Sequence, residues 1–141
     1  MATTTYLTNP VVSITPPAGA ATDMTDQCTS AAIINLFESQ DVTAFGDGSR
    51  KYVAGLGNPE VTLTLFVSYG AAEVEATLAA CVGKTSTLVI GTKSGGAAAD
   101  NPIYTLTGGY LESFEPITGS VGEMSTVDVT FTGGVLTRAI T

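Results

Sequence analysis

The chain has no histidine and no tryptophan, and its 141 residues include only five lysines and arginines against thirteen aspartates and glutamates. Without histidine, the commonest general base and metal ligand is missing, which excludes Ser-His-Asp and Cys-His catalysis. Five cations cannot line a groove for nucleic acid, because each phosphate contact needs a lysine or an arginine. The sequence therefore argues against conventional catalysis and against tight nucleic-acid binding.

Cysteine is also scarce, with only Cys28 and Cys81 present. Two distant cysteines without histidine do not make a zinc site. A disulfide is allowed by number, but Cys81 falls in an apolar, helix-like run, and we expect two buried, reduced thiols. No apolar run approaches the ~18 residues that span a membrane. The start, MATTTYLTNP, lacks the features of a signal peptide, so we expect synthesis and assembly in a cytoplasm.

Short motifs that resemble active-site loops fail on spacing. TGSVGE (118–123) lacks the Gly-x-Ser-x-Gly of a nucleophile elbow. GDGSRK (46–51) lacks the Lys-[Ser/Thr] and the following helix of a phosphate loop. The paired carboxylates Glu112 and Glu115 have no tryptophan platform for a sugar. We therefore expect no enzyme, no small-molecule substrate, no cofactor and no metal.

Charge is low overall: charged residues make up 13% of the chain, against roughly 25% in ordinary soluble domains. Hydrophobic residues make up 44%, and the length suits a single domain (1–141) with a hydrophobic core. The low charge indicates that other subunits cover part of the surface, which predicts a homo-oligomer. A threonine-rich secreted domain would have a similar composition, and that alternative stays open.

Alternation of apolar and polar residues predicts a mainly β fold. Residues 60–69 show it best, with an apolar face at Val61, Leu63 and Leu65 opposite threonines. An apolar stripe at helical spacing predicts one α-helix over 71–83. We expect a β-sandwich or small barrel of six to seven strands with this helix at its flank. The expected strands are 9–15, 31–38, 60–69, 85–93, 101–117 and 124–132, with 135–141 as a last short strand or a C-terminal arm, a flexible arm at 1–8 and a loop at 16–30.

Three local signals sharpen this expectation. NPVVSIT, NPEVTLT and NPIYTLT begin at residues 9, 58 and 101, and we interpret each Asn-Pro as the start of a strand. Gly108-Gly109, inside one strand, predicts a bulge. AAIINLFE (31–38) is apolar on both faces, which indicates burial on both sides or an interface.

Two segments in this order resemble the major tail tube proteins of long-tailed bacteriophages. DVTAFGDGSRKYVAGLGNPEVTLTLFVSY (41–69) resembles the central strand, glycine-rich loop and threonine-rich strand of that family. NPIYTLTGGYLESFEPITGSVGEMSTVDVTFTGG (101–134) resembles its C-terminal half. The helix between them also fits, whereas residues 1–39 match only in having a strand or two. The type VI secretion tube protein is similar in fold.

This resemblance implies a β-sandwich whose six copies form a ring with a continuous inner barrel. Rings would stack into a tube in the virion tail that conducts the genome to the host. The implied partners are further copies and the tape measure, tail terminator and distal tail proteins. DNA would pass without specific binding, so an acidic or neutral lumen suits the tube. Acidic residues that we expect on polar strand faces are the candidates for that lumen: Glu60, Glu112, Glu123 and Asp128.

The segment 41–59 is the candidate contact between subunits. In the family the long loop reaches an adjacent ring, and here four glycines accompany the adjacent cations Arg50 and Lys51. We expect a projecting loop whose cations meet carboxylates of a neighbour and whose apolar side chains anchor it. The residues concerned are Phe45, Asp47, Arg50, Lys51, Tyr52, Val53 and Leu56. The plainer alternative is a mobile surface loop.

Two other functions compete with a tail tube. A capsid decoration protein, or another virion protein, would also be β-rich and oligomeric, but it offers no reason for the 41–59 segment. A soluble β-sandwich binding module of a cell-surface protein would need export.

Overall fold

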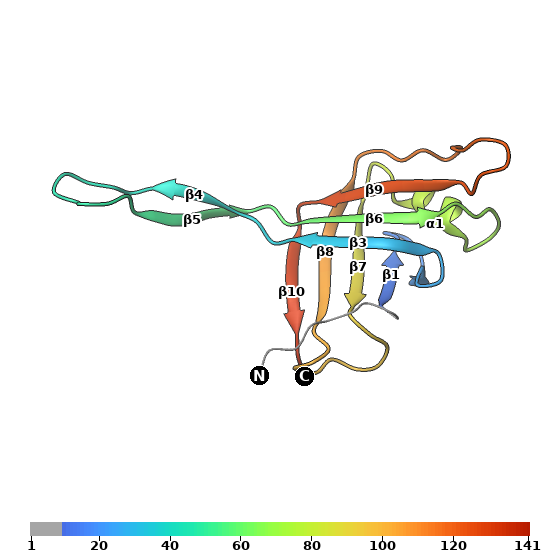
Figure 1. The fold of residues 1–141 in the computed structure, drawn as a ribbon, viewed down its shortest axis with the longest axis horizontal. Coiled ribbons are helices and arrows are strands. Elements are labelled where there is room, and N and C mark those ends of the chain that lie inside the picture. The colour runs from blue at the N-terminus through green and yellow to red at the C-terminus, as the bar shows by residue number, and fades with distance from the viewer. Residues whose placement is uncertain (1–9) are drawn as a thin grey trace.

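Residues 10–141, the part of the chain that the computed structural model describes, form ten strands and one helix (Figure 1). The elements in chain order are β1 (Val11–Thr15), β2 (Thr22–Asp23), β3 (Cys28–Ile34), β4 (Phe37–Asp41), β5 (Tyr52–Gly57), β6 (Glu60–Phe66), α1 (Val74–Cys81), β7 (Thr85–Gly91), β8 (Ile103–Leu111), β9 (Thr126–Thr132) and β10 (Val135–Ala139). The expected arm at 1–8 lies outside the described residues.

Eight strands belong to one sheet, in the order β2-β1-β7-β8-β9-β6-β3, with β10 also paired to β8. Strand β8 joins two parts of this sheet, because residues 103–107 pair with β10 while Tyr110 and Leu111 pair with β9. In Figure 1 the strands β3, β6 and β9 cross over β1, β7, β8 and β10. The sheet therefore folds over onto itself as a sandwich, and it does not close into a barrel.

Glycines form the corner where the sheet folds. The register between β7 and β8 shifts after Ser86, and Gly108 occupies this irregularity with a φ of 80°. Gly134, between β9 and β10, has a φ of 83°, and a Cβ there would lie 2.8 Å from the carbonyl carbon of Gly108. Side chains do not fit where two backbones approach this closely. The bulge predicted at Gly108-Gly109 is confirmed.

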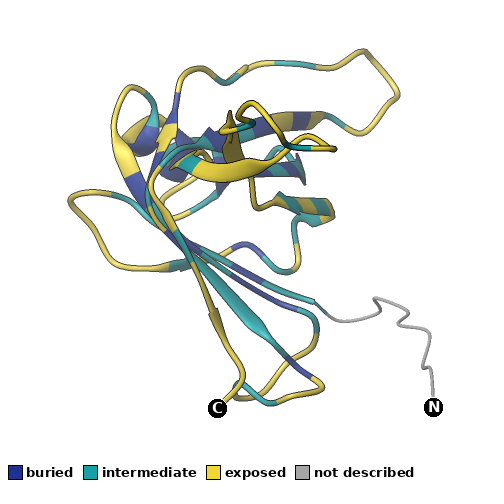
Figure 2. Ribbon diagram, turned by 90° about the vertical axis from the view of Figure 1, so that its left-hand side faces the viewer, coloured by how far each residue is buried: buried dark blue, intermediate teal, exposed yellow. Residues whose placement is uncertain are grey.

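Buried residues alternate with more exposed ones along strands of both layers (Figure 2), and the buried ones form the core between the layers. Along β6, Val61, Leu63 and Leu65 are buried, while the threonines between them are partly exposed. Strand β9 alternates in the same way, and Phe131 is its largest buried side chain. The helix α1 adds Val74, Leu78 and Cys81. The period-two patterns predicted for these strands and the apolar stripe of the helix are thus confirmed.

Prolines precede three strands, as the repeated Asn-Pro pattern predicted. Pro10, Pro59 and Pro102 each stand immediately before β1, β6 and β8. Asn101 is buried. Its Oδ1 accepts a hydrogen bond from the Lys93 amide at 3.2 Å, and its Nδ2 donates a hydrogen bond to the Gly96 carbonyl at 3.0 Å. These hydrogen bonds of Asn101 therefore stabilise the turn that precedes β8.

The predicted boundaries need three corrections. There are ten strands among the described residues rather than six or seven, because the predicted loop 16–30 contains β2, the predicted loop 41–59 contains β5, and 31–38 is divided between two strands. The single strand predicted at 31–38 is two strands, separated at Asn35 and Leu36. The helix covers Val74–Cys81, inside the wider range expected. Both cysteines are free thiols, as expected, but Cys28 is only partly buried.

Candidate functional site

A two-stranded hairpin projects from the body of the protein (Figure 1). It consists of β4 and β5, which pair only with each other and extend the neighbouring body strands β3 and β6. The register places Asp41 opposite Tyr52 and Gln40 opposite Val53. This corrects the prediction of a loop over 41–59, since Tyr52–Gly57 is a strand and the irregular part is 42–51.

Two glycines of β5 allow side chains of β4 to lie across the hairpin. A Cβ at Gly57 would come within 3.0 Å of the Phe37 ring, and a Cβ at Gly55 would come within 2.9 Å of Gln40 Nε2. These side chains therefore cover the glycine backbone of β5. The glycines are part of a strand in this segment and are not loop residues.

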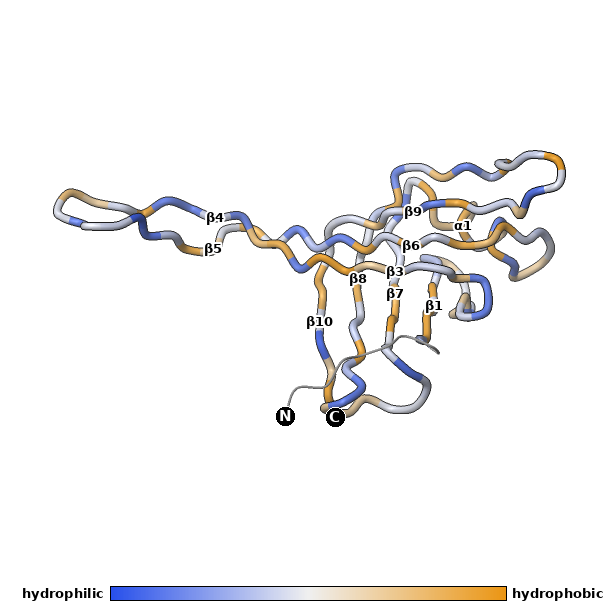
Figure 3. The backbone as a smooth tube through the Cα atoms, in the orientation of Figure 1, coloured by the Kyte–Doolittle hydropathy of each residue, from blue (hydrophilic) through white to orange (hydrophobic). Residues whose placement is uncertain are grey.

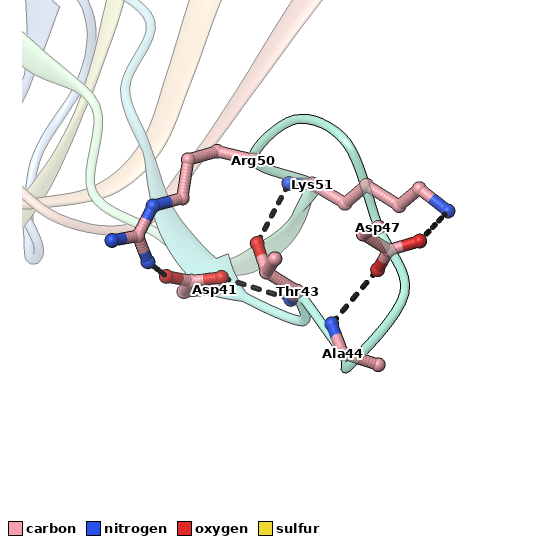
Figure 4. Close-up of polar contacts among 6 residues, drawn as sticks. All are labelled: Asp41, Thr43, Ala44, Asp47, Arg50 and Lys51. Carbon is pink, nitrogen blue, oxygen red and sulfur yellow. Dashed lines mark hydrogen bonds and ion pairs between the residues drawn. The ribbon is translucent and has the colours of Figure 1, made fainter.

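Two ion pairs fix the tip of the hairpin (Figure 4). Arg50 Nη1 lies 2.9 Å from Asp41 Oδ2, and Lys51 Nζ lies 2.6 Å from Asp47 Oδ1. Both cations were expected to meet carboxylates of a neighbouring subunit, but in the single chain each has a carboxylate within the same tip. The tip, defined as residues 41–51, thus carries two cations and two carboxylates and is neutral in sum.

Hydrogen bonds to the backbone complete the tip (Figure 4). The Ala44 amide donates to Asp47 Oδ2 at 2.8 Å, and the Thr43 amide donates to Asp41 Oδ1 at 2.9 Å. The Lys51 amide donates to Thr43 Oγ1 at 2.9 Å. The two aspartates therefore each bind a cation and a backbone amide, which gives an exposed loop a defined shape.

These contacts lower the pKa values of both aspartates. Hydrogen bonds from the Thr43 hydroxyl and amide, together with the Arg50 guanidinium, hold the pKa of Asp41 below its ordinary value of 3.8. The Lys51 ammonium and the Ala44 amide do the same for the pKa of Asp47. A carboxyl whose pKa is lowered by folding stabilises the folded form above its ordinary pKa, and loses this effect as the pH falls through the lowered value.

We therefore expect the tip to keep its shape at pH 5 to 7 and to loosen only below about pH 3.8. The measurement is an NMR titration that follows the Thr43 and Ala44 amide protons. Their shifts should move with midpoints below 3.8, the ordinary value. Asp47→Asn should abolish the transition at Ala44 and leave the one at Thr43. Midpoints at or above the ordinary value would contradict the hydrogen bonding described here.

Large apolar side chains are exposed on this ordered hairpin. Phe45 is fully exposed at the tip, and Leu56 is 77% exposed. All seven residues predicted from the sequence as contact residues lie on the hairpin. Figure 3 shows apolar positions at the tip and at the base of the hairpin. Exposed apolar surface of this kind marks protein-protein contacts.

The sequence interpretation missed other exposed apolar residues at the same place. Phe37 and Val42 belong to the hairpin, and Ile34 and Leu36 lie at its base, each about half exposed. The sequence signal for these residues is the segment 31–38, which is apolar on both faces of the predicted strand. That pattern is compatible with burial on both sides or with an interface. Since Ile34, Leu36 and Phe37 are exposed in the single chain, the interface is favoured.

A polar face covers β6 and β9 on the side away from the core. Glu60 and Asp128 lie on it, where Thr64 Oγ1 donates to Asp128 Oδ1 at 2.7 Å and Thr62 faces Thr130. Glu112 and Glu123 are exposed but belong to the segment 112–125 between β8 and β9. The expectation that all four acidic residues lie on strand faces is therefore wrong for these two.

Within residues 10–141, no group of three histidine, cysteine, aspartate or glutamate side chains is placed to bind a metal ion. The helix of this region is too short to cross a membrane.

No protein-family model matches the sequence, and no curated protein matches it. Solved structures do match in fold. The SPP1 tail tube protein aligns with a TM-score of 0.73 at 10% identity, covering 98% of this chain and 80% of that one. A protein from the tail of an empty GTA particle, of C6 symmetry, gives 0.68 at 14% identity, covering 90% and 92%.

Tube components of injection systems are similar as well. A protein of the tube-terminating cap of the anti-feeding prophage aligns with a TM-score of 0.67 at 13% identity, covering 100% of this chain and 94% of that one. These three matches cover 90% or more of this chain and 80% or more of the other chains, so the likeness concerns the whole domain and not one part of it. The chain therefore has the fold shared by phage and phage-like tail tube and tube-terminator proteins.

Proposed function

We propose that this protein is a structural subunit of a phage or phage-like tail tube, which delivers the genome to the host. Copies form rings, six to a ring by analogy with the family that the sequence resembles, and the rings stack. The observation that carries the proposal is the ordered, neutral hairpin with exposed apolar side chains, which projects from a domain of tail-tube fold. The role is structural and not enzymatic.

The threonine-rich face of β6 and β9 is proposed to line the channel. Its threonines are small and polar, and Glu60 and Asp128 make it acidic. A basic lining would hold DNA through many phosphate contacts, whereas a conduit must let it slide. Glu112 and Glu123, on the segment 112–125, are proposed to border the same channel. A map of assembled rings with these carboxylates on the outer wall would contradict this assignment.

The proposed location is the tail of the virion, with assembly in the host cytoplasm. The partners are further copies of this chain along the tube. The proteins that begin, end and fill such a tube (distal tail, terminator and tape measure) are partners by the family resemblance alone.

Electron microscopy of the purified protein tests the proposal. We expect rings with a central hole, or tubes with a regular axial repeat. A monodisperse monomer at high concentration would count against a tube subunit.

A variant that lacks the hairpin tests whether the hairpin is the contact between subunits. The Asn58 amide donates to the Leu36 carbonyl at 2.7 Å, so the chain closes at the base of the hairpin. Replacing residues 37–57 by a short Gly-Ser turn should leave the sandwich folded, as measured by circular dichroism and thermal unfolding. The same variant should form no tubes, because the projecting contact is gone. Normal tubes from this deletion would show that the hairpin is not the contact.

A further inference from the structure

A neutral groove opens between the two layers of the sandwich. It has a volume of about 410 Å³ and lies between β3 on one side and the ends of β1, β7 and β8 on the other. Apolar lining residues include Pro10, Ala31, Ile33, Ile90 and Tyr104. Cys28 also contributes to the wall. No aspartate, glutamate, lysine or arginine is among the described residues that line it.

We propose that this groove is the receptor for the hairpin tip of a second copy of the chain, with Phe45 as the side chain that enters it. The inference rests on the proposed function and adds to it the surface that receives the hairpin.

Charge complementarity favours this partner. Each copy has a net charge of −8, so two copies repel each other over most of their surfaces. The hairpin tip is an exception, because its cations and carboxylates neutralise one another within the chain. The groove is another exception, because no charged residue is among the described residues that line it. A neutral, apolar tip in an uncharged groove avoids both like-charge repulsion and the desolvation of an unpaired charge.

The shapes of the two surfaces agree with this pairing. Phe45 is fully exposed beside Gly46, whose φ of 94° turns the chain at the apex. An aromatic side chain that enters an apolar groove is the usual form of a strong contact between proteins. A groove of about 410 Å³ falls in the size range of cavities that hold ligands, so it has room for one aromatic ring and its neighbours.

The positions of tip and groove explain why the partner is another copy. The groove lies in the body, where residues of β3 from Cys28 to Ile33 form one wall, whereas the hairpin leaves β3 at Ile34 and carries its tip away from the body. From Leu36 to Phe45 the chain extends about 30 Å, in nine steps of ~3.3 Å per residue, away from the body (Figure 1). A tip this far from the groove of its own chain enters the groove of another copy, which gives a head-to-tail contact. Such a contact builds an open stack unless it closes into a ring.

Cys28 makes the contact testable by cross-linking. The variant Phe45→Cys places a second thiol at the tip, and Cys81 is buried and out of reach. Tubes of this variant, treated with a mild oxidant, should give dimers and longer ladders on a non-reducing gel. Mass spectrometry should identify a peptide that links position 45 to Cys28. The link should vanish in Phe45→Cys with Cys28→Ser, and it should not form with Val121→Cys, an equally exposed position outside the hairpin.

Each outcome decides the inference. Tubes of Phe45→Cys without this link would overturn the groove as receptor and leave the proposed function intact. Absence of tubes from the wild-type protein would overturn both. A Tyr6→Cys variant that links to Cys28 in tubes would assign the groove to the N-terminal segment and overturn the inference. If Phe45→Cys fails to assemble, Ala44→Cys keeps the aromatic ring and tests the same contact.

Assembly itself gives a second readout. Phe45→Ala should raise the protein concentration needed for assembly at least tenfold, whereas Val121→Ala should leave it unchanged. Thr29→Trp fills the groove from an exposed position on its wall and should have the same effect as Phe45→Ala. An unchanged assembly threshold for both Phe45→Ala and Thr29→Trp would overturn the inference.

Discussion

Reversing both cations of the hairpin tip, by Arg50→Glu together with Lys51→Glu, is expected to leave a folded subunit that no longer assembles or assembles only weakly. In the single chain each cation binds an aspartate of the same tip. A glutamate at either position would face that aspartate, and the two like charges would repel each other. The tip would lose its shape, and the net charge of the chain would change from −8 to −12. Sedimentation and electron microscopy measure the loss.

A charge-matched control separates the effect of losing the tip's ion pairs from the effect of a more negative net charge. Lys84→Glu with Lys93→Glu makes the same change in charge away from the hairpin, and Lys93 also has an exposed ion pair, with Asp100 at 2.7 Å. We expect this control to assemble far better than the tip variant. Thermal unfolding should be nearly the same for both, because exposed ion pairs contribute little to stability. Normal tubes from the tip variant would show that the two cations are incidental.

The second large effect is expected at the corner of the sheet. Gly134→Ala should destabilise the protein by about 3 kcal/mol or more, because it combines the strain of a positive φ with a clash of backbones. Gly133→Ala should cost only about 1 kcal/mol, because that glycine has a similar φ of 78° and no atom within 4 Å of an added Cβ. Urea unfolding of the two variants measures the difference. Equal losses would mean that the close approach of Gly134 to Gly108 is unimportant.

The parts of the fold that could be predicted depend on local patterns. Strands β6 and β9 alternate strictly, and each Asn-Pro marks a strand start because proline donates no hydrogen bond to a ladder. The folded-over sheet could not be predicted, because it depends on β8 pairing with β7 on one side and with β9 and β10 on the other. These pairings join residues far apart in the sequence.

The candidate site could be predicted only in part. The tip residues were identified from their glycines and adjacent cations, but β5 was missed because Gly55 and Gly57 weaken its strand pattern. They are tolerated there because Phe37 and Gln40 cover them from β4. The pair of Asp41 and Arg50 forms only once the hairpin register brings the two residues together. The groove is assembled from residues of β3, β7 and β8 together with Pro10 before β1, and no local sequence pattern predicts it.

The way in which the hairpin joins the body has a mechanical consequence. Its two strands run on from β3 and β6, which lie side by side and are paired over their length, while β6 is also paired with β9. A pull along the hairpin draws β3 and β6 in the same direction, so it loads the hydrogen bonds between β6 and β9 in shear, all at once, and does not peel them one after another. A tube held together by such hairpins would resist stretching along its axis, and bending would be confined to the short spans at the hairpin bases.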